Sequence, residues 1–369
     1  MHKRTVTLRL LTLVLACALA LALGEAILRA ARLPGITYHS YAYDPLTGGT
    51  LYPGSRVLYR GPRGDFVERR VNRWGYLDVD HAREKPEGTV RIGFFGDSYV
   101  AARQVPLEET FFRRIQRQLG ARVEVLAFGI GARGTVQSYL DCSQRMAAFD
   151  LDRVVYVFCE NDPGDQLWEA RRANVFPYAA LEGDSFRVDY TTRAYYEKRS
   201  QGLYRPWQAL KARSLVLSTI DQRLKLLKQH GLRARVPRAQ LGEALRPPRC
   251  TAPSTWPSDS LLAQAQALQG RVMERWMREV TAEGRRFAVL YARWGEWRAP
   301  PDEEDSWAPW LRRFCAERGI ALIDPTPQLV ARMDGGLEVH YDHYTPHGHE
   351  ALAEAFVAHL AGERASEDH

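Results

Sequence analysis

The chain has 369 residues, with 51 Lys and Arg against 44 Asp and Glu, and its formal charge is +7 at neutral pH. Hydrophobic residues make up 45% and charged residues 26%, a composition that excludes a mainly disordered chain, a collagen-like repeat and a multi-span membrane protein. So small a basic excess does not indicate nucleic-acid binding. The five Cys residues are widely spaced without a CxxC pair, and the ten His residues form no HExxH motif. We therefore expect neither a disulfide scaffold nor a metal site.

A basic start followed by an apolar run opens the chain. Lys3 and Arg4 precede a stretch from Leu10 to Leu23 that is almost wholly apolar, which is the layout of an export signal. With its flanks the segment reaches the length of about 20 residues that spans a bilayer. We expect residues 1–29 to form a transmembrane signal anchor. Positive charges favour the cytoplasmic side, so the remainder should be extracytoplasmic, on the periplasmic or cell-envelope face.

Other outcomes for this segment stay open. Ala20-Leu21-Ala22 resembles a small-x-small cleavage site, so the segment can instead be a cleaved signal. A lipoprotein interpretation at Cys17 is weaker, because apolar sequence continues beyond it. The third alternative is a helix buried in a soluble core.

Five short apolar runs predict buried strands, at residues 90–95, 123–128, 154–158, 287–291 and 320–324. Helical segments separate them, so we predict an α/β protein: a three-layer α/β/α sandwich with a five-stranded parallel sheet. Small or polar residues follow the strands, where open α/β sheets place their sites. We assign residues 89–165 and 280–362 to this core, and the turn-rich residues 30–88 to a lead-in packed on it.

Residues 166–279 form an insertion that we expect to be helical and basic. From Arg205 to Arg249 there are eleven Arg and Lys, opposed by Asp221 and Glu243 alone. Apolar residues from Leu215 to Leu232 recur at helical spacing and predict an amphipathic helix. Such a helix suits contact with anionic headgroups or an acidic polymer, although a charge run is often just a solvated face. Nucleic acid is not an expected partner, since no recognition motif is present.

Four blocks at the strand ends carry reactive groups. Gly96-Asp97-Ser98 would present a hydroxyl at a tight turn above the sheet. The Gly-rich loop 129–134 can offer a backbone N–H beside it. Asn161, after the third strand, can donate its amide to a developing oxyanion. His343, before the last helix, can reach over the sheet edge as a general base.

Taken together, these blocks resemble the SGNH/GDSL hydrolase superfamily over residues 89–165 and 280–362. The resemblance implies the flavodoxin-like SGNH fold, Ser98 as nucleophile and His343 as base. It also implies an oxyanion hole formed by the backbone N–H groups of Ser98 and Ala132 and by the Asn161 amide. Ala132 stands where the family usually has Gly, and Cys159 stands where the third block usually begins with Gly.

The catalytic acid departs from the family pattern. The family places an Asp three, or sometimes two, residues before the His, and here these positions hold His340 and Tyr341. The nearest carboxylate is Asp342. Glu338 or Asp334, or no side-chain acid at all, are the alternatives.

Asp97 and Asp162 are interpreted as turn-holding residues, and His347 and His349 as helix-start or packing residues.

The resemblance implies a serine esterase or O-acyltransferase, without a cofactor, acting through a Ser98 acyl-enzyme. Membrane-tethered relatives suggest an acetyl ester of an envelope or exopolysaccharide substrate. Hydrolysis and transfer are not separable, because both use the same acyl-enzyme. The alternative from another class is a catalytically weak binding or assembly factor that holds an anionic glycan.

Overall fold

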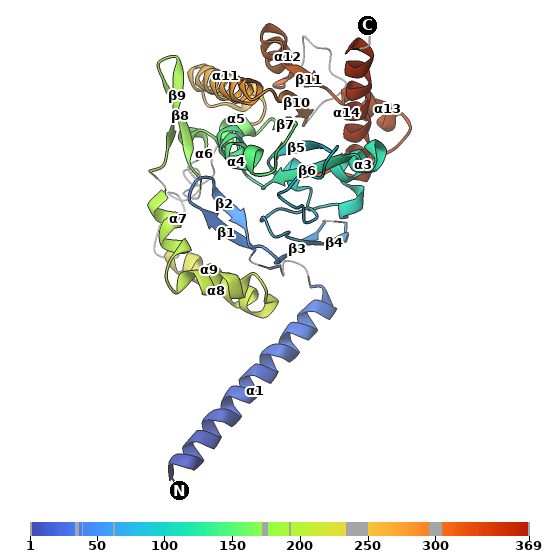
Figure 1. Ribbon diagram of the computed structural model, residues 1–369. Helices are drawn as coiled ribbons and strands as arrows, with labels where there is room; N and C mark the ends of the chain where they lie inside the picture. Colours follow the sequence, from blue (N-terminus) through green and yellow to red (C-terminus); the bar gives the residue numbers. More distant parts are fainter. Residues whose placement is uncertain are drawn as a thin grey trace.

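The computed structural model describes residues 2–33, 37–38, 40–61, 63–171, 176–191, 193–233, 250–294 and 305–367. A five-stranded parallel sheet in the order β11-β10-β7-β5-β6 lies at its centre (Figure 1). Its strands are β5 (Val90–Gly96), β6 (Val123–Gly129), β7 (Arg153–Cys159), β10 (Arg286–Ala292) and β11 (Ala321–Ile323). All five predicted strands are present, and the prediction of an α/β fold with a five-stranded parallel sheet is confirmed.

Helices cover both faces of this sheet, because successive strand residues point to opposite sides. One face packs against α4 (Thr135–Ala148), α11 (Asp259–Ala282) and α12 (Ala308–Glu317); the other packs against α3 (Phe111–Leu119), α13 (Thr326–Asp334) and α14 (Pro346–Glu367). The ring of Tyr156 lies 5.0 Å from that of Trp276 on the first face. Phe94 contacts Phe356 at the same distance on the second. The result is a three-layer sandwich with one apolar cluster on each side.

The strand order determines where a ligand can bind. Numbered along the chain, the five strands lie in the order 2-1-3-4-5, which is the flavodoxin-like arrangement. β6 lies on one side of β5 and β7 on the other, so the winding reverses there and leaves a crevice at the carboxyl ends of these strands. Ser98 follows β5 and Asn161 follows β7, which places both at this crevice.

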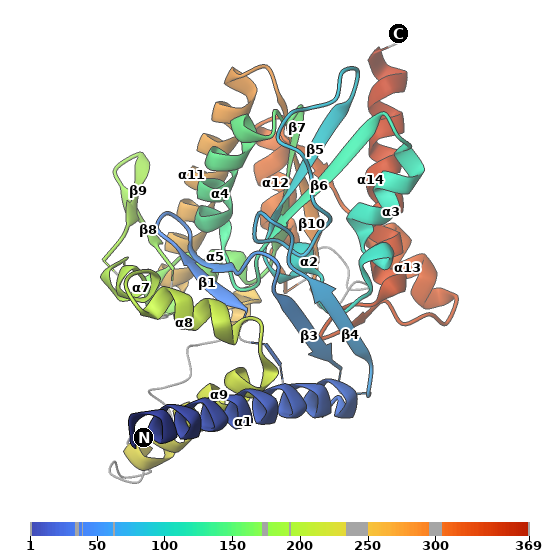
Figure 2. The ribbon, with the colours of Figure 1, turned by 60° about the horizontal axis from the view of Figure 1, so that its bottom comes forward.

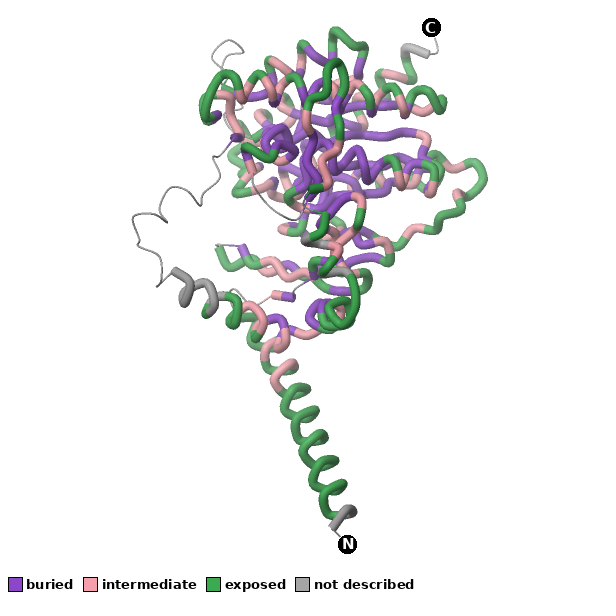
Figure 3. Tube along the Cα trace, turned by 90° about the vertical axis from the view of Figure 1, so that its left-hand side faces the viewer, coloured by how far each residue is buried: buried purple, intermediate pink, exposed green. Residues whose placement is uncertain are grey.

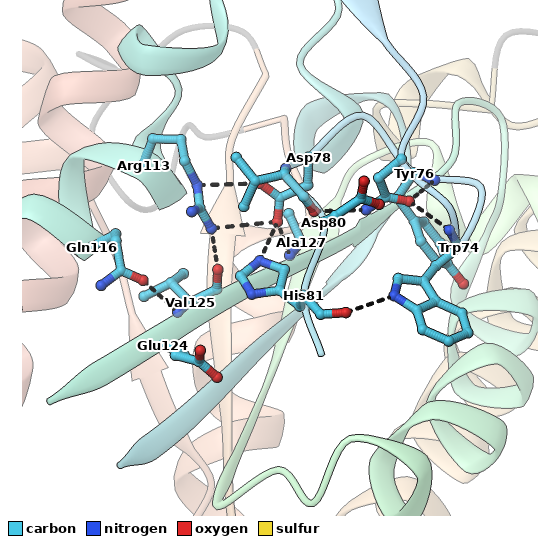
Figure 4. A network of polar contacts seen from close by, with 12 residues as sticks. Trp74, Tyr76, Asp78, Asp80, His81, Arg113, Gln116, Glu124, Val125 and Ala127 are labelled. Carbon is cyan, nitrogen blue, oxygen red and sulfur yellow. Dashed lines mark hydrogen bonds and ion pairs between the residues drawn. The ribbon is translucent and has the colours of Figure 1, made fainter. Parts of the chain in front are cut away.

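The lead-in contains two antiparallel hairpins, β1 (Tyr41–Asp44) with β2 (Gly48–Leu51) and β3 (Arg56–Arg60) with β4 (Phe66–Arg70). After them a network of polar contacts joins this segment to the core (Figure 4). The buried carboxylate of Asp78 accepts from the Ala127 backbone N–H at 3.0 Å and pairs with Arg113. Burial alone would raise the pKa of Asp78, but Arg113 and His81 hold it below its ordinary value. This ion pair fixes β6 and the loop that follows it.

A second buried network reaches the same loop. Arg133 is fully buried, forms an ion pair with Asp141 at 2.6 Å and donates to Thr47 of the lead-in at 2.9 Å. The Tyr76 hydroxyl donates to the same carboxylate at 2.7 Å. Removing one member of such a buried pair costs about 3–5 kcal/mol, so the residue directly after Ala132 is firmly anchored.

The region between β7 and β10 contains both small elements and a full layer helix. After α6 (Trp168–Arg171) come the hairpin of β8 (Tyr178–Glu182) and β9 (Ser185–Asp189) and the helices α7 (Arg193–Ser200), α8 (Tyr204–Lys211) and α9 (Leu215–Arg233). The predicted helix from Leu215 to Leu232 is therefore confirmed as α9. The far end of the predicted basic run, with Arg235, Arg238, Arg246 and Arg249, lies outside the described residues. α11 falls within the same region of the sequence but covers the sheet.

The first helix, α1 (His2–Ala31), stands apart from the sandwich. Its segment Thr5–Ala31 is long and apolar enough to cross a membrane, and it projects away from the domain (Figures 1 and 3). It is exposed rather than buried. This suits a signal sequence or an anchor and does not suit a helix buried in the core.

Candidate active site

Ser98 lies at the turn between the strand β5 and the short helix α2 (Ser98–Ala101). Asp97 caps that helix, because its Oδ1 accepts from the Tyr99 N–H at 2.9 Å. The loop after β6 approaches closely: an added Cβ on Gly129 would lie 2.2 Å from the Ala101 nitrogen. Glycine is therefore required at 129, and the half-buried Ser98 hydroxyl is held beside this loop.

His343 lies in a two-residue strand, β13 (His343–Tyr344), which pairs with β12 (His340–Tyr341) just before α14. Its Nε2 is 2.8 Å from the Ser98 Oγ. Its Nδ1 is 3.1 Å from a carboxylate oxygen of Asp342, whose side chain is 60% exposed. With the imidazole proton on Nδ1, donated to Asp342, Nε2 is left to accept from the Ser98 hydroxyl. The structure thus brings the three predicted residues into one chain of contacts.

The other candidate acids have different surroundings. Glu338 forms an ion pair with Arg63 at the surface, and Asp334 ends the helix α13. At the family's acid position, the His340 Nε2 contacts the Tyr99 hydroxyl at 2.9 Å. Burial and the neighbouring His343 lower the pKa of His340 to about 4, so this residue is neutral at neutral pH.

The loop after β6 also lines the site. An added Cβ on Gly131 would lie 3.7 Å from the Ser98 Cβ, so the loop passes directly beside this serine. Ala132 follows in the left-handed region with φ 71°, and Arg171 donates to its carbonyl oxygen. An alanine in the left-handed region is strained by about 1–2 kcal/mol, and the buried Arg133 next to it holds this conformation.

Asn161 lines the same cavity as Ser98, but its amide already has partners. It directly precedes α5 (Asp162–Asp165), and its Nδ2 lies 2.8 Å from Asp165 Oδ2 and 3.2 Å from Asp97 Oδ2. Both amide hydrogens therefore have carboxylate acceptors, whereas the sequence-based expectation was a donor aimed at substrate. Burial raises the pKa of Asp165 to about 6, although Arg171 opposes this shift.

A cavity of about 400 Å³ opens above these residues. One wall carries the predicted site residues Ser98, Ala132, Asn161, Asp342 and His343, together with Asp97, Gly131 and Asp165. The lead-in supplies the facing wall: Thr37, Tyr38, Ser40, Tyr41, Leu51, Val57, Leu58 and Leu77. Sequence reasoning missed this second wall, because nothing in a turn-rich segment indicates which surface it covers. It also missed Asp165, although the repeated acidic residues after Asn161 were a signal.

The remaining singled-out residues serve the scaffold. Asp162 is fully buried, accepting from the Tyr156 hydroxyl at 2.6 Å and from the Cys159 N–H at 2.9 Å. Burial raises the pKa of the Cys159 thiol well above its ordinary value, so this thiol is unreactive. His349 is fully buried against Phe111. Within the described ranges, no group of three or more His, Cys, Asp or Glu residues is arranged to hold a metal ion.

No protein-family model matches the sequence, and no curated protein matches it. Solved structures similar to the chain include a putative lipolytic protein of the G-D-S-L family from Desulfitobacterium hafniense DCB-2, at 8% identity and a TM-score of 0.38, covering 72% of this chain and 97% of that one. A lipase/acylhydrolase from Enterococcus faecalis aligns at 12% identity with a TM-score of 0.39 (74% and 97% covered). The acetyl xylan esterase AlAXEase aligns at 10% identity with a TM-score of 0.39, covering 73% of this chain and 100% of that one. At such identities and TM-scores these likenesses say nothing about the site.

Proposed function

We propose that this protein is an SGNH-type serine esterase or O-acyltransferase. The observation that carries the proposal is the 2.8 Å contact between the Ser98 hydroxyl and the His343 Nε2. It occurs at the topological switch point, in a cavity large enough for a small ester. A serine in contact with an imidazole that is oriented through its other nitrogen is the arrangement that activates a hydroxyl for nucleophilic attack.

The reaction then takes two steps. The Ser98 Oγ attacks the acyl carbon of the ester while the His343 Nε2 takes its proton, and the same imidazole returns that proton to the departing alkoxide. The acyl-enzyme that remains is released by water in a hydrolase or by a hydroxyl of a second substrate in a transferase. Asp342 holds the imidazole in the tautomer that this sequence of transfers requires.

The oxyanion of the tetrahedral intermediate forms on the opposite side of the site. The backbone N–H groups of Ser98 and Ala132 and the Asn161 amide are the proposed donors. Asn161 must first exchange one of its carboxylate partners for the substrate oxygen. The contact to Asp97, at 3.2 Å, is the longer and weaker of the two. Asp165 keeps the amide in place during this exchange.

The proposed substrate is an acylated carbohydrate of the cell envelope or an exopolysaccharide, and the acyl group is acetyl. Ser98 and His343 need no cofactor for this chemistry. The apolar helix α1 supports a membrane-anchored protein. Lys3 and Arg4 before the apolar stretch favour an extracytoplasmic domain. The lead-in and core then face the envelope substrate.

Acetate release from p-nitrophenyl acetate tests this proposal. Ser98→Ala should lower the rate at least about a hundredfold relative to wild type, whereas Ser185→Ala, at an exposed position in the β8–β9 hairpin, should leave it unchanged. Equal rates for wild type and Ser98→Ala would remove the enzyme proposal. Adding an acetylatable oligosaccharide then separates transfer from hydrolysis by the appearance of acetylated product.

One observation favours the second candidate, a catalytically weak binding or assembly factor for an anionic glycan. The Asn161 amide hydrogens are both engaged by carboxylates, which weakens the oxyanion hole in the resting state. A fluorophosphonate that labels reactive serines separates the two candidates: labelling at Ser98 supports the enzyme, and no labelling together with glycan retention supports the binder.

A further inference from the structure

Two helices of the region between β7 and β10 expose apolar stripes. At the start of α8, Leu203, Trp207 and Leu210 are 90%, 41% and 52% exposed. On α9, Ile220, Leu224 and Leu227 are 48%, 54% and 67% exposed. Both sets follow the spacing i, i+4, i+7, which places each on a single face of its helix. Large apolar side chains arranged this way on two neighbouring helices indicate a surface that is covered by something.

The position of α9 is fixed by α1. The Glu25 carboxylate of α1 accepts from the Ser214 hydroxyl at 3.0 Å and from the Val216 N–H at 3.2 Å. An added Cβ on Gly24 would lie 3.3 Å from Val216. The first turn of α9 therefore lies against the end of α1 that joins the domain, and Figure 2 shows α9 alongside α1.

The length of α1 places this junction at a bilayer surface. From Thr5 to Leu23 a helix rises about 28 Å at 1.5 Å per residue, and the hydrocarbon core of a bilayer is about 30 Å thick. If this segment spans the membrane, Gly24 and Glu25 emerge at the headgroups. The start of α9 is then at the same depth.

The cations beside the apolar stripe of α9 are consistent with a position at the headgroups. Arg223 lies between Ile220 and Leu224 in the sequence and is exposed, as is Lys225. Lys225 pairs with Asp221 at 2.8 Å, and the buried Lys211 pairs with the same carboxylate at 2.9 Å. Apolar residues flanked by exposed cations are typical of helices that lie in the interface of a membrane with anionic lipids.

We infer that α8 and α9 rest on the lipid surface that α1 enters, with their apolar stripes among the headgroups and Arg223 near lipid phosphates. The inference rests on α1 being a membrane anchor, which is part of the proposed function. A bilayer is favoured over a second copy of the chain because α9 packs against α1, whose exposed apolar segment enters the same bilayer. The Gln222 amide donates to the Thr37 carbonyl at 3.3 Å, and Thr37 lines the Ser98 cavity. The cavity is thereby held close to the lipid surface.

Spin-label accessibility in the full chain tests this contact. Single cysteines replace Leu203 and Leu224 in a Cys17→Ser background, since the other four cysteines are buried. The protein is reconstituted in vesicles of 3:1 phosphatidylcholine and phosphatidylglycerol. Leu15→Cys reports whether α1 is inserted. Glu283→Cys, at the amino-terminal edge of the sheet, serves as the aqueous control.

Labels at 203 and 224 should be accessible to oxygen and at least about fivefold less accessible to a water-soluble nickel chelate than the label at 283, as expected for an interfacial depth. If the label at 15 is in lipid while those at 203 and 224 match the aqueous control, the inference is wrong and the anchor stands. If the label at 15 is itself aqueous, the anchor fails and the inference with it. Strong dipolar coupling between labels at 224 on two chains would assign the stripes to a second copy and overturn the inference.

Discussion

The carboxylate of Asp342 contacts the imidazole of the residue directly after it, with 3.1 Å between Oδ2 and the His343 Nδ1. Adjacent side chains in extended chain point to opposite sides. Here Asp342 adopts a φ of 61° between two short paired strands, and this left-handed turn brings both side chains to the same side. In the proposed reaction the carboxylate that orients the imidazole therefore comes from a different position than in the SGNH pattern.

Asp342→Asn should lower kcat for an ester substrate by about tenfold, less than the ~10⁴ seen when a buried triad Asp is replaced, because this carboxylate is exposed to water. Asn tolerates the left-handed conformation, so the turn is kept. Glu338→Gln, a nearby exposed carboxylate paired with Arg63, is the matched control and should leave kcat unchanged. An equal loss in both variants would argue against Asp342 as the orienting acid.

Ala132→Gly should leave the free energy of unfolding unchanged or raise it by up to about 1 kcal/mol, because glycine adopts a φ of 71° without strain. Ala267→Gly, at an exposed position within α11, should lower it by about 1 kcal/mol. Urea unfolding of both variants gives the comparison. Esterase activity should survive in Ala132→Gly, since the backbone donor remains. If Ala132→Gly lost as much unfolding free energy as Ala267→Gly, the strain assigned to the left-handed conformation of Ala132 would be contradicted.

Because of the raised pKa of Asp165, we expect the free energy of unfolding to fall as the pH rises. Burial raises its pKa to about 6 in the folded chain, from a model-peptide value of 3.8. Between these values the unfolded chain releases its proton first, so folding loses stability as pH rises from about 4 to 7. Asp165→Asn should remove this loss, worth about 2–3 kcal/mol. The measurement is the difference in unfolding free energy between variant and wild type at pH 4 and pH 7.

The matched control is Asp324→Asn. Burial opposes ionisation at Asp324 as well, but hydrogen bonds from Thr326 and Arg312 lower its pKa. Its stability contribution is therefore lost only below pH 4, and this variant should show no difference in slope between pH 4 and 7. If the unfolding free energies of wild type and Asp165→Asn depend on pH in the same way between pH 4 and 7, the raised pKa of Asp165 is contradicted.

For His349 we expect the opposite pH dependence of the unfolding free energy, at acid pH. Burial lowers its pKa to about 3, from 6.5. Below pH 6.5 His349 is protonated in the unfolded chain but stays neutral in the folded chain, so the free energy of unfolding falls as the pH drops. His349→Gln keeps an acceptor for the Phe111 N–H and should reduce this loss between pH 6.5 and 4 by about 3 kcal/mol. His347→Gln, exposed on the same helix turn, should not. Unchanged acid sensitivity in His349→Gln would contradict this account.

Much of the sheet was predictable because buried parallel strands are continuous apolar runs whatever their neighbours. The relation between Ser98 and His343 was predictable too, since both follow from blocks that precede helices at one sheet edge. The contact of Asp342 with His343 was a hypothesis among alternatives, because it depends on a backbone conformation that sequence spacing does not reveal.

Other features depend on tertiary contacts. The Asn161 amide is engaged because the turn of α5 brings Asp165 back toward it. The sequence shows that Asn161 can donate a hydrogen bond but does not show which group accepts it. The position of the lead-in depends on buried contacts such as the one from Arg133 to Thr47. Arg133 and Thr47 are far apart in the sequence, and only the folded chain identifies them as partners.

The account depends most directly on Ser98 being a nucleophile. Incubating the purified full chain with a fluorophosphonate and locating the adduct by peptide mass spectrometry tests this. The account predicts a single phosphonylated residue, Ser98, with labelling abolished in Ser98→Ala and slowed at least about tenfold in His343→Ala, because the imidazole that accepts the proton is gone. A folded protein that stays unlabelled, or one labelled equally in wild type and Ser98→Ala, would contradict it.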